Sequence, residues 1–381
     1  MTTESRLTER STGHPTISKV SFGSVRYNLE RDPVRWGAHQ FESSVLVVLI
    51  TASDGATGLG VVWASGQDDF HHAAAAQSLL PAAVLGRDAH NPYTSSLSAQ
   101  NVGHSSGFVK AACALELGLW DLAGNSLKQP TYQLLGCKRK ILPAYVISAE
   151  EFSFTEISQY TEIVQRYKQD GFLACKLHLW GDISKDIKAC IAIRDAVGSD
   201  FQLMLDPAGR YTRDDALRVG TVLQDLGFIR FEDPISPSDP EGYTWLKSRL
   251  NIPLVANEVL KWDVYQCESA AANGDVQGMR VDLGRAGITK ALRMAAIAEV
   301  HGCELDVASM APQGGLEACL HFGLSSANTL WFEHHEMLEL NAVPGLIPGY
   351  TVKEGFALPN DATGLGFDID WQKFEAAVTW A

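Results

Sequence analysis

Three carboxylates follow three successive apolar runs of the sequence at equal spacing. Asp206 follows the run 202–205, and Glu232 and Glu258 each come 26 residues after the one before. Three carboxylates brought together repel one another unless a positive charge lies between them. Carboxylate oxygens are the ligands that Mg²⁺ prefers. The residue types and their spacing therefore predict a Mg²⁺ site, provided that the fold brings the three run ends to one place.

A basic pair precedes the first of these carboxylates. Lys176 and His178 lie two residues apart in the apolar run 174–179. If this run is a strand, both side chains point to the same face. A Lys beside a metal can neutralise a bound carboxylate, and an imidazole can take or return a proton near neutral pH. The pair predicts proton-transfer chemistry beside the metal.

These residues require a fold that gathers the ends of many strands. From residue 142 on, eight short β-forming runs alternate with amphipathic segments, and a polar residue recurs at the ends of the runs every 24 to 28 residues. This is the pattern of a parallel β/α barrel, in which the strand ends form one mouth where active sites lie. A doubly wound sheet is the alternative, but the sequence lacks a glycine-rich phosphate loop. The predicted strands are 144–148, 174–179, 202–205, 229–231, 254–256, 279–281, 304–307 and 330–332, and the helices include 154–170, 184–197, 213–226, 289–300 and 314–327.

The first third of the chain has a different texture. After a loose tail at 1–15, three strands are predicted at 17–25, 43–51 and 58–64, with turn-forming residues after the second. Helical segments follow at 70–85 and 107–127. Residues 16–138 therefore form an α+β unit ahead of the barrel.

Taken together, these motifs resemble the enolase superfamily, and most closely its mandelate racemase and muconate-lactonizing enzyme branch. The matching segments are 114–124, 134–136, the Lys176-x-His178 pair, 205–212, 231–234, 256–258, 282–289 and 331–333. The resemblance implies a (β/α)7β TIM-type barrel at 139–345, closed by an α+β capping domain built from 16–138 and completed by 346–381. It also implies that Asp206, Glu232 and Glu258 bind one Mg²⁺ per subunit and that the chain forms a homo-oligomer.

The reaction shared by that family starts with removal of the proton α to a carboxylate, and a Lys and the metal stabilise the enediolate. Removing this proton places two negative charges on one group, which a preorganised cluster of cations must offset. By the same resemblance, Glu333 approaches a carboxylate oxygen of the substrate. We expect Glu333 to be protonated, because only then can it donate a hydrogen bond there.

The sequence departs from the family at residues that set the reaction. His178 stands where a second Lys is common, Asp282 matches the acid of a His–Asp pair, and Ala308 stands where the His of that pair is expected. The Lys of the muconate-lactonizing pattern near 282 is also absent. A single strong base favours syn elimination: His178 takes the α-proton and protonates the departing β-hydroxyl, so that a sugar acid becomes a 2-keto-3-deoxy acid. A racemase, epimerase or cycloisomerase on the same scaffold remains an alternative, as does a non-catalytic sugar-acid binding protein.

Further residues are candidates for contacting the substrate. Besides Asp282, they are Arg285, Trp63 and His104, and the segment 27–40 is expected to form a lid. The neighbouring histidines His334 and His335 are expected to have packing roles, because adjacent residues of a strand point to opposite faces.

Composition excludes several other classes of protein. The chain has 381 residues and a net charge of −14, which disfavours a nucleic-acid binder and a polybasic membrane-surface protein. No apolar run approaches the roughly 18–20 residues of a membrane helix, and the start of the chain has no secretory signal. The seven cysteines have no CxxC pair and are expected to be buried reduced thiols of a cytoplasmic protein. We expect a small-molecule carboxylate substrate, drawn in by the metal and Lys176 despite the overall negative charge.

Overall fold

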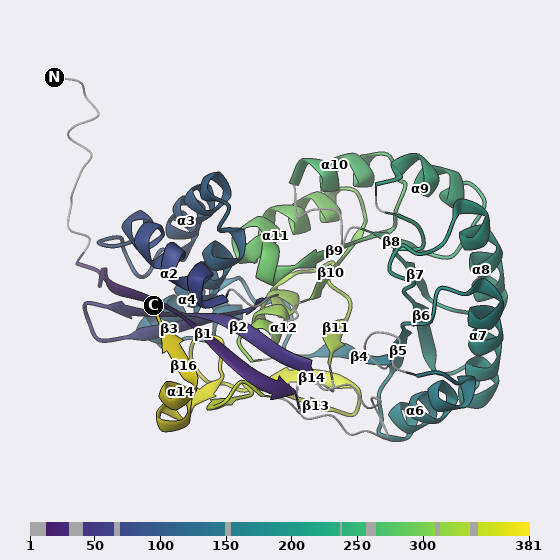
Figure 1. Cartoon of the computed structure of the whole chain (residues 1–381). Coiled ribbons are helices and arrows are strands. Elements are labelled where there is room, and N and C mark those ends of the chain that lie inside the picture. Colours follow the sequence, from purple (N-terminus) through teal and green to yellow (C-terminus); the bar gives the residue numbers. More distant parts are fainter. Residues whose placement is uncertain are drawn as a thin grey trace.

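The computed structural model describes residues 13–29, 41–64, 69–148, 154–236, 238–256, 264–308, 313–335 and 342–381. The predicted metal ligand Glu258 lies outside these residues, and so does most of the segment expected to form a lid, 30–40. Figure 1 shows a ring of helices around strands, with a second group of strands and helices beside it that contains both ends of the described chain.

The ring is a parallel barrel of eight strands and seven helices within the described residues. The strands are β4 (Leu142–Ser148), β5 (Ala174–Leu177), β6 (Gln202–Leu205), β7 (Arg230–Glu232), β8 (Leu254–Ala256), β9 (Gly278–Asp282), β10 (Glu304–Ala308) and β11 (Phe332–His334). Neighbouring strands pair in chain order from β4 to β10, β11 pairs in parallel with β4, and β10 contacts β11. The predicted (β/α)7β barrel is confirmed, and the doubly wound alternative is excluded.

Helices cover the outside of this ring (Figure 1). They are α6 (Ile157–Gln169), α7 (Ile183–Val197), α8 (Arg213–Asp225), α9 (Pro240–Lys247), α10 (Val264–Ala272), α11 (Leu283–Val300) and α12 (Gly315–Ser325). Side-chain oxygens at the helix starts accept the first free backbone N–H groups; for example, Asp182 accepts from Ser184 and Lys185, and Thr212 accepts from Asp215. These two caps fix where α7 and α8 begin relative to the ends of β5 and β6, which lie at the mouth of the barrel.

Three barrel elements differ from the sequence-based prediction in ways that affect the site. β5 ends at Leu177 rather than at 179, so His178 lies just after the strand. β11 comprises Phe332–His334 rather than 330–332, so Glu333 lies within the strand and not after it. α11 begins at Leu283 rather than at 289 and has a kink at Gly287, whose φ of 73° is in the left-handed region. Gly287 interrupts the helical pattern of the sequence, so the pattern did not predict the first turn of the helix.

The second part of the molecule is built on a four-stranded antiparallel sheet. β1 (Ile17–Leu29), β2 (Phe41–Ala52) and β3 (Thr57–Ala64) form a meander, and β16 (Val378–Trp380) adds to the edge at β1. α2 (Asp69–Leu79), η2 (Pro81–Ala83), α3 (Pro92–Ser106), α4 (Val109–Leu127) and α5 (Thr131–Leu134) accompany this sheet. The sequence analysis missed α3, because its many Ser and Asn residues leave little helical periodicity.

The central helix α4 lies very close to β3. A Cβ atom on Gly60 would collide with the carbonyl oxygen of Ala114, so glycine is required for this approach. Two buried carboxylates then connect α4 to distant segments. Glu116 accepts the N–H of Thr289 on α11 at 2.5 Å, and Asp121 accepts those of Leu59 at 2.9 Å and Leu365 at 2.7 Å. Burial raises the pKa of Asp121 to about 7 in spite of these bonds.

The C-terminal segment contacts both parts of the molecule. β13 (Tyr350–Lys353) and β14 (Phe356–Pro359) form a hairpin that pairs with β4 of the barrel. Before this hairpin lies β12 (Leu346–Ile347), which pairs with β15 (Asp368–Ile369) after it. The chain then passes through α14 (Trp371–Ala377) to β16 in the antiparallel sheet. The domain boundaries of the sequence analysis stay a prediction.

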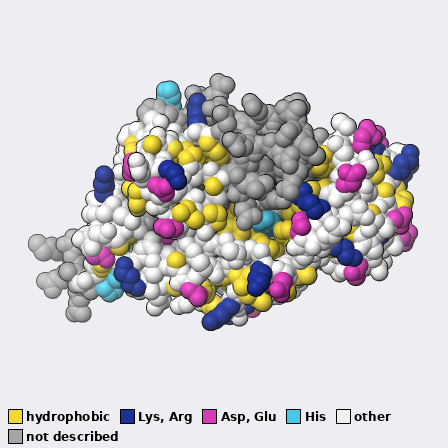
Figure 2. Space-filling view, turned by 90° about the horizontal axis from the view of Figure 1, so that it is seen from below, with side chains coloured by type: hydrophobic (Ala, Val, Ile, Leu, Met, Phe, Trp, Pro, Cys, Tyr) yellow, Lys and Arg dark blue, Asp and Glu magenta, His cyan; other side chains and the backbone are white. Residues whose placement is uncertain are grey.

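Three global properties follow from the described residues. All seven cysteines are free thiols, and six of them are buried. None of the described helices is both long and apolar enough to cross a bilayer. On the face shown in Figure 2, acidic and basic side chains are interspersed without a continuous area of either sign.

Candidate active site

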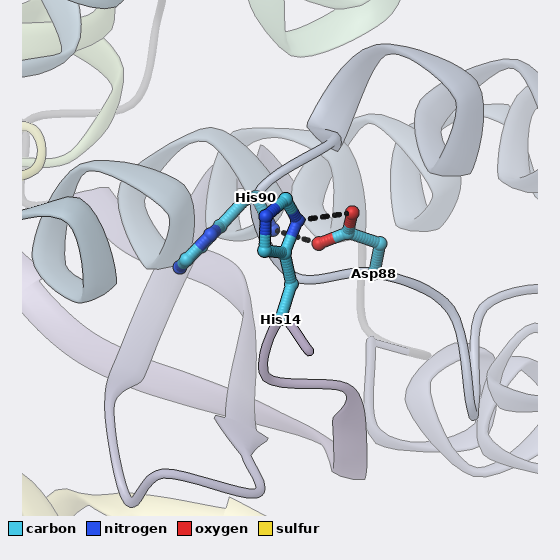
Figure 3. Close-up of side chains that lie close together, drawn as sticks. All are labelled: His14, Asp88 and His90. Carbon is cyan, nitrogen blue, oxygen red and sulfur yellow. Dashed lines mark hydrogen bonds and ion pairs between the residues drawn. The ribbon is translucent and has the colours of Figure 1, made fainter. Parts of the chain in front are cut away.

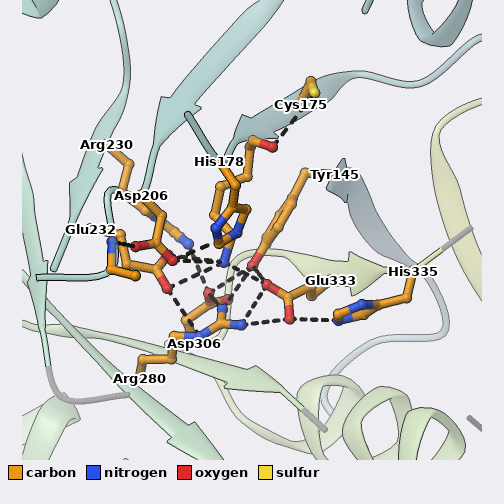
Figure 4. Close-up of polar contacts among 12 residues, drawn as sticks. Tyr145, Cys175, His178, Asp206, Arg230, Glu232, Arg280, Asp306, Glu333 and His335 are labelled. Carbon is orange, nitrogen blue, oxygen red and sulfur yellow. Dashed lines mark hydrogen bonds and ion pairs between the residues drawn. The ribbon is translucent and has the colours of Figure 1, made fainter. Parts of the chain in front are cut away.

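Lys176 lies inside the barrel among three buried carboxylates, Asp206, Glu232 and Glu333, which Figure 4 shows close together. Its side chain is fully buried, and Nζ lies 2.7 Å from Glu333, 3.2 Å from Glu232 and 3.9 Å from Asp206. Burial and the neighbouring Arg280 lower the pKa of Lys176, but the three carboxylates outweigh them and raise it. Lys176 is therefore an ammonium group at any physiological pH.

Asp206 and Glu232, two of the predicted metal ligands, both lie close to Lys176. Asp206 follows β6 and Glu232 ends β7, both are buried, and both face Lys176. The described carboxylates at this level, including Glu333, face two buried cations, Lys176 and Arg280. A donor set of carboxylate oxygens with excess negative charge fits a hard divalent cation. Glu258 would follow the adjacent strand β8, outside the described residues.

His178 directly follows β5, and its imidazole approaches the same atom as Lys176, Oδ2 of Asp206. Its side chain is 19% exposed, and Nε2 lies 3.7 Å from Oδ2 of Asp206. Tyr160 donates a hydrogen bond of 2.6 Å to the carbonyl oxygen of His178 and so fixes its backbone. Burial, Lys176 and Arg280 hold the pKa of His178 well below its usual value, and Glu333 opposes them only in part. The imidazole is neutral at neutral pH and able to accept a proton.

Two residues of the site were not predicted from the sequence. Arg280 on β9 binds Glu232 through Nε at 3.0 Å and both oxygens of Glu333 through Nη2. His335, assigned a packing role from the sequence, places Nε2 2.9 Å from Oε1 of Glu333 and is 3% exposed. Figure 4 shows His335 and His178 on different sides of Glu333. The available signal was the two-residue spacing in a strand: Arg280 precedes Asp282 by two, and His335 follows Glu333 by two.

Glu333 accepts hydrogen bonds from several neighbours. Burial alone would raise the pKa of its carboxyl, but Arg280, Lys176 and His335 together hold it well below the usual value. Tyr145 adds a hydrogen bond of 2.5 Å to Oε2. Glu333 is therefore held as a carboxylate by these neighbours, and its protonation toward a bound substrate stays a prediction.

Arg280 also contacts a second group of buried charged side chains, which lies deeper in the barrel. Oδ2 of Asp306 lies 2.7 Å from Nη1 of Arg280, 2.8 Å from Nη1 of Arg230 and 3.0 Å from the hydroxyl of Tyr145. Arg230 also pairs with Glu304. These side chains fill the barrel beneath the site, so the positions of Glu232 and Glu333 depend on the network as a whole.

The remaining candidates lie around the start of α11. Asp282 caps this helix by accepting the N–H of Gly284 at 2.7 Å, and it lies 3.2 Å from Nε of Arg285. Ala308 is in register with Asp282 on the neighbouring strand and presents only a methyl group. Arg285 and His104 line one pocket between α3, α4 and α11. Trp63 contacts Lys110, whose Nζ lies 4.8 Å from the ring centre.

Comparisons with known proteins agree on one family. The family model "Enolase C-terminal domain-like" matches residues 159–373, more than half of the chain, and "Mandelate racemase / muconate lactonizing enzyme, N-terminal domain" matches 20–136. L-talarate/galactarate dehydratase of Salmonella typhimurium is 28% identical over 340 residues, covering 87% of this chain and 82% of the relative. Hydrophobic dipeptide epimerase of Enterococcus faecalis is 28% identical over 243 residues, covering 62% and 67%.

A solved structure extends the comparison to three dimensions. The crystal structure of D-glucarate dehydratase from Agrobacterium tumefaciens, complexed with magnesium, matches with a TM-score of 0.83 and 26% identity. The match covers 96% of this chain and 100% of that one. The relatives thus include both dehydratases and isomerases on this scaffold.

Proposed function

Because the chain belongs to the mandelate racemase and muconate-lactonizing enzyme family of the enolase superfamily, we propose that it is a Mg²⁺-dependent hydro-lyase. Its substrate is a sugar acid and its product a 2-keto-3-deoxy acid. The observation that carries this proposal is the pair formed by a buried ammonium, Lys176, and a neutral, partly exposed imidazole, His178, which both approach Oδ2 of Asp206. The dehydratase names of several relatives, and the magnesium of the glucarate dehydratase structure, support it.

The residues divide the reaction between binding and proton transfer. Asp206 and Glu232, with Glu258 as the third predicted ligand, hold the Mg²⁺, which stabilises negative charge on the substrate carboxylate when it is bound. Lys176 binds the same carboxylate and offsets the second charge that forms when the α-proton leaves. Arg280 holds Glu232 and Glu333 in place from below.

His178 then moves the proton. Nε2 takes the α-proton, the electron pair of the C–H bond forms a C=C bond, and the C–O bond to the β-hydroxyl breaks. His178 returns the proton to this hydroxyl, which leaves as water. The enol product becomes the 2-keto-3-deoxy acid by losing its O–H proton to solvent and taking a proton at the carbon that lost the hydroxyl. Hydroxide is a poor leaving group without this proton, so one imidazole serves as base and then as acid.

The test is a panel of aldonic and aldaric acids incubated with the protein and Mg²⁺, with 2-keto acid formation as the readout. We expect turnover of at least one member, its loss with EDTA and its recovery with added Mg²⁺. We expect His178→Asn to lose turnover by about 10²–10⁴-fold. His301→Asn is the matched control, because His301 is exposed at the end of α11. Full activity of His178→Asn, or activity that persists in EDTA, would contradict the proposal.

An isomerase is the second candidate function. A racemase or epimerase of this family needs a proton donor besides His178, and His335 is a second buried imidazole beside Glu333. Exchange of solvent deuterium into recovered substrate, with inversion at the α-carbon and no keto acid, would establish it. Mg²⁺-dependent thermal shifts by a sugar acid without any turnover would instead indicate a binding protein.

Two properties of the whole protein complete the proposal. We expect it to be a cytoplasmic homo-oligomer, in line with its reduced thiols. Sedimentation equilibrium of the purified chain tests the assembly.

A further inference from the structure

A second group of metal-ligating side chains lies on the sheet side of the molecule, on elements separate from the barrel. His14 precedes β1, and Asp88 and His90 lie between η2 and α3. One nitrogen or oxygen atom of each lies within 4.8 Å of the others. Figure 3 shows the His14 ring facing the carboxylate of Asp88, with the ring of His90 beside that of His14, 4.9 Å away between ring centres. Neither the proposed function nor the family motifs use these residues.

Backbone hydrogen bonds hold the two segments in a fixed frame. Ala89 donates to the carbonyl oxygen of Pro15 at 2.9 Å, and Ile17 donates to that of Arg87 at 2.9 Å. Thr16 and Asp88 form an antiparallel bridge between these bonds. The backbone positions of His14, Asp88 and His90 are therefore set without a metal, which lowers the entropic cost of binding one.

The tautomer of His90 follows from its hydrogen bonds. Ser126 donates its only hydroxyl hydrogen to Asp54 at 2.7 Å, because a carboxylate only accepts. The same hydroxyl oxygen lies 2.9 Å from Nε2 of His90, so it accepts a hydrogen from that nitrogen. Neutral His90 then carries its hydrogen on Nε2 and has its lone pair on Nδ1. A metal-ligating His usually donates the hydrogen of its other ring nitrogen to a second group in this way.

The carboxylate of Asp88 is oriented as well. Oδ1 accepts the backbone N–H of His90 at 2.8 Å, and Oδ2 lies 2.9 Å from Nδ1 of His14. Burial raises the pKa of Asp88, but the bonds from His14 and His90 outweigh it and lower the pKa. Asp88 is thus a carboxylate directed at His14. The side chains of His14 and Asp88 are 49% and 27% exposed, which gives an ion access from solvent.

Two imidazoles and one carboxylate are ligands for a borderline divalent ion rather than for Mg²⁺. We propose that His14, Asp88 and His90 bind one Zn²⁺, which ties the segment ahead of β1 to the loop ahead of α3. Solvent completes the coordination on the exposed side. The role of the ion is structural, because the cluster joins the segment before β1 to the loop before α3, with Ser126 on α4 as the outer partner of His90.

The experiment is a titration of the full-length protein with Zn²⁺ in excess Mg²⁺, which occupies the barrel site. We expect one tightly bound Zn²⁺ per chain by calorimetry, and a Co²⁺ absorption spectrum typical of four-coordinate nitrogen and oxygen ligands. Zn²⁺ also raises the unfolding temperature, because it binds only the folded frame. Acidification weakens binding, because an imidazole binds a metal ion only in its deprotonated form.

Variants separate this site from any other. His14→Ala and His90→Ala lose the Zn²⁺ equivalent, whereas His301→Ala, at an exposed His elsewhere, keeps it. Ser126→Ala removes only the outer partner of His90 and weakens binding by about 10–100-fold. Circular dichroism in Mg²⁺ shows that each variant is folded. The proposal is overturned if the wild type binds no Zn²⁺ in excess Mg²⁺, or if folded His14→Ala and His90→Ala keep the equivalent.

Discussion

Asp306 is the residue whose replacement tests the buried charge network most directly. Oδ2 accepts hydrogen bonds from Arg230 and Arg280 and lies 3.0 Å from the hydroxyl of Tyr145, whereas Oδ1 has no hydrogen-bond partner among the described residues. In Asp306→Asn the amide oxygen can take the place of Oδ2, and the NH₂ group can take the place of Oδ1. The variant thus removes the charge and leaves the shape and hydrogen-bond geometry nearly unchanged.

The expected loss of stability is large. Both guanidinium groups are 2% exposed, and burying them costs several kcal/mol each unless a carboxylate compensates. Removing one partner of a buried ion pair costs about 3–5 kcal/mol of the free energy of unfolding. We expect Asp306→Asn to fall in this range, although two arginines lose a partner, because removing the carboxylate also removes its own desolvation cost.

The measurement is equilibrium urea unfolding, followed by tryptophan fluorescence and far-ultraviolet circular dichroism. Asp239→Asn is the matched control, because Asp239 also pairs with an arginine, Arg213, but both side chains are partly exposed. Asn also remains a good cap for α9, which Asp239 begins. We expect little change in the control. A loss below about 1 kcal/mol in Asp306→Asn, or one equal to that of the control, would refute the network as a source of stability.

Three further predictions concern single residues. Lys176→Met should lower kcat by about 10²–10³-fold on any substrate found in the acid panel, because the enediolate loses its ammonium partner, and a loss below tenfold would contradict that role. His335→Phe should cost about 1–3 kcal/mol in urea unfolding, because a buried carboxylate loses a donor, whereas an unchanged midpoint would show that the bond to Glu333 is dispensable. Asp121 has its pKa raised to about 7, so its contribution to stability is complete below about pH 4 and is lost as pH rises through about 7. We therefore expect the urea midpoint of Asp121→Asn to decline less than that of the wild type between pH 5 and pH 8, a range that spans the pKa of about 7. An equal decline in both proteins would mean that other groups, such as Glu317, cause it.

The sequence by itself determined the barrel and the first set of site residues. Strand side chains alternate, and a βα unit has a nearly constant length, so the positions of Lys176, Asp206 and Glu232 place them at one mouth without knowledge of any contact. The shift of β11 by two residues shows the limit of this reasoning, because the polar residues Glu333 and His334 after Phe332 do not indicate that the strand continues.

Only the tertiary structure decided which charges face one another. Arg280 and Asp306 lie 26 residues apart on neighbouring strands, and nothing local to either residue indicates their ion pair. The protonation state of Glu333 likewise depends on Lys176 and Arg280, which other strands bring to its oxygens. The electrostatic energy of a buried group depends on the distances to all charges around it, and strand order and side-chain direction set those distances. The cluster of His14, Asp88 and His90 has the same origin, since a backbone ladder brings His14 to residues more than 70 positions away.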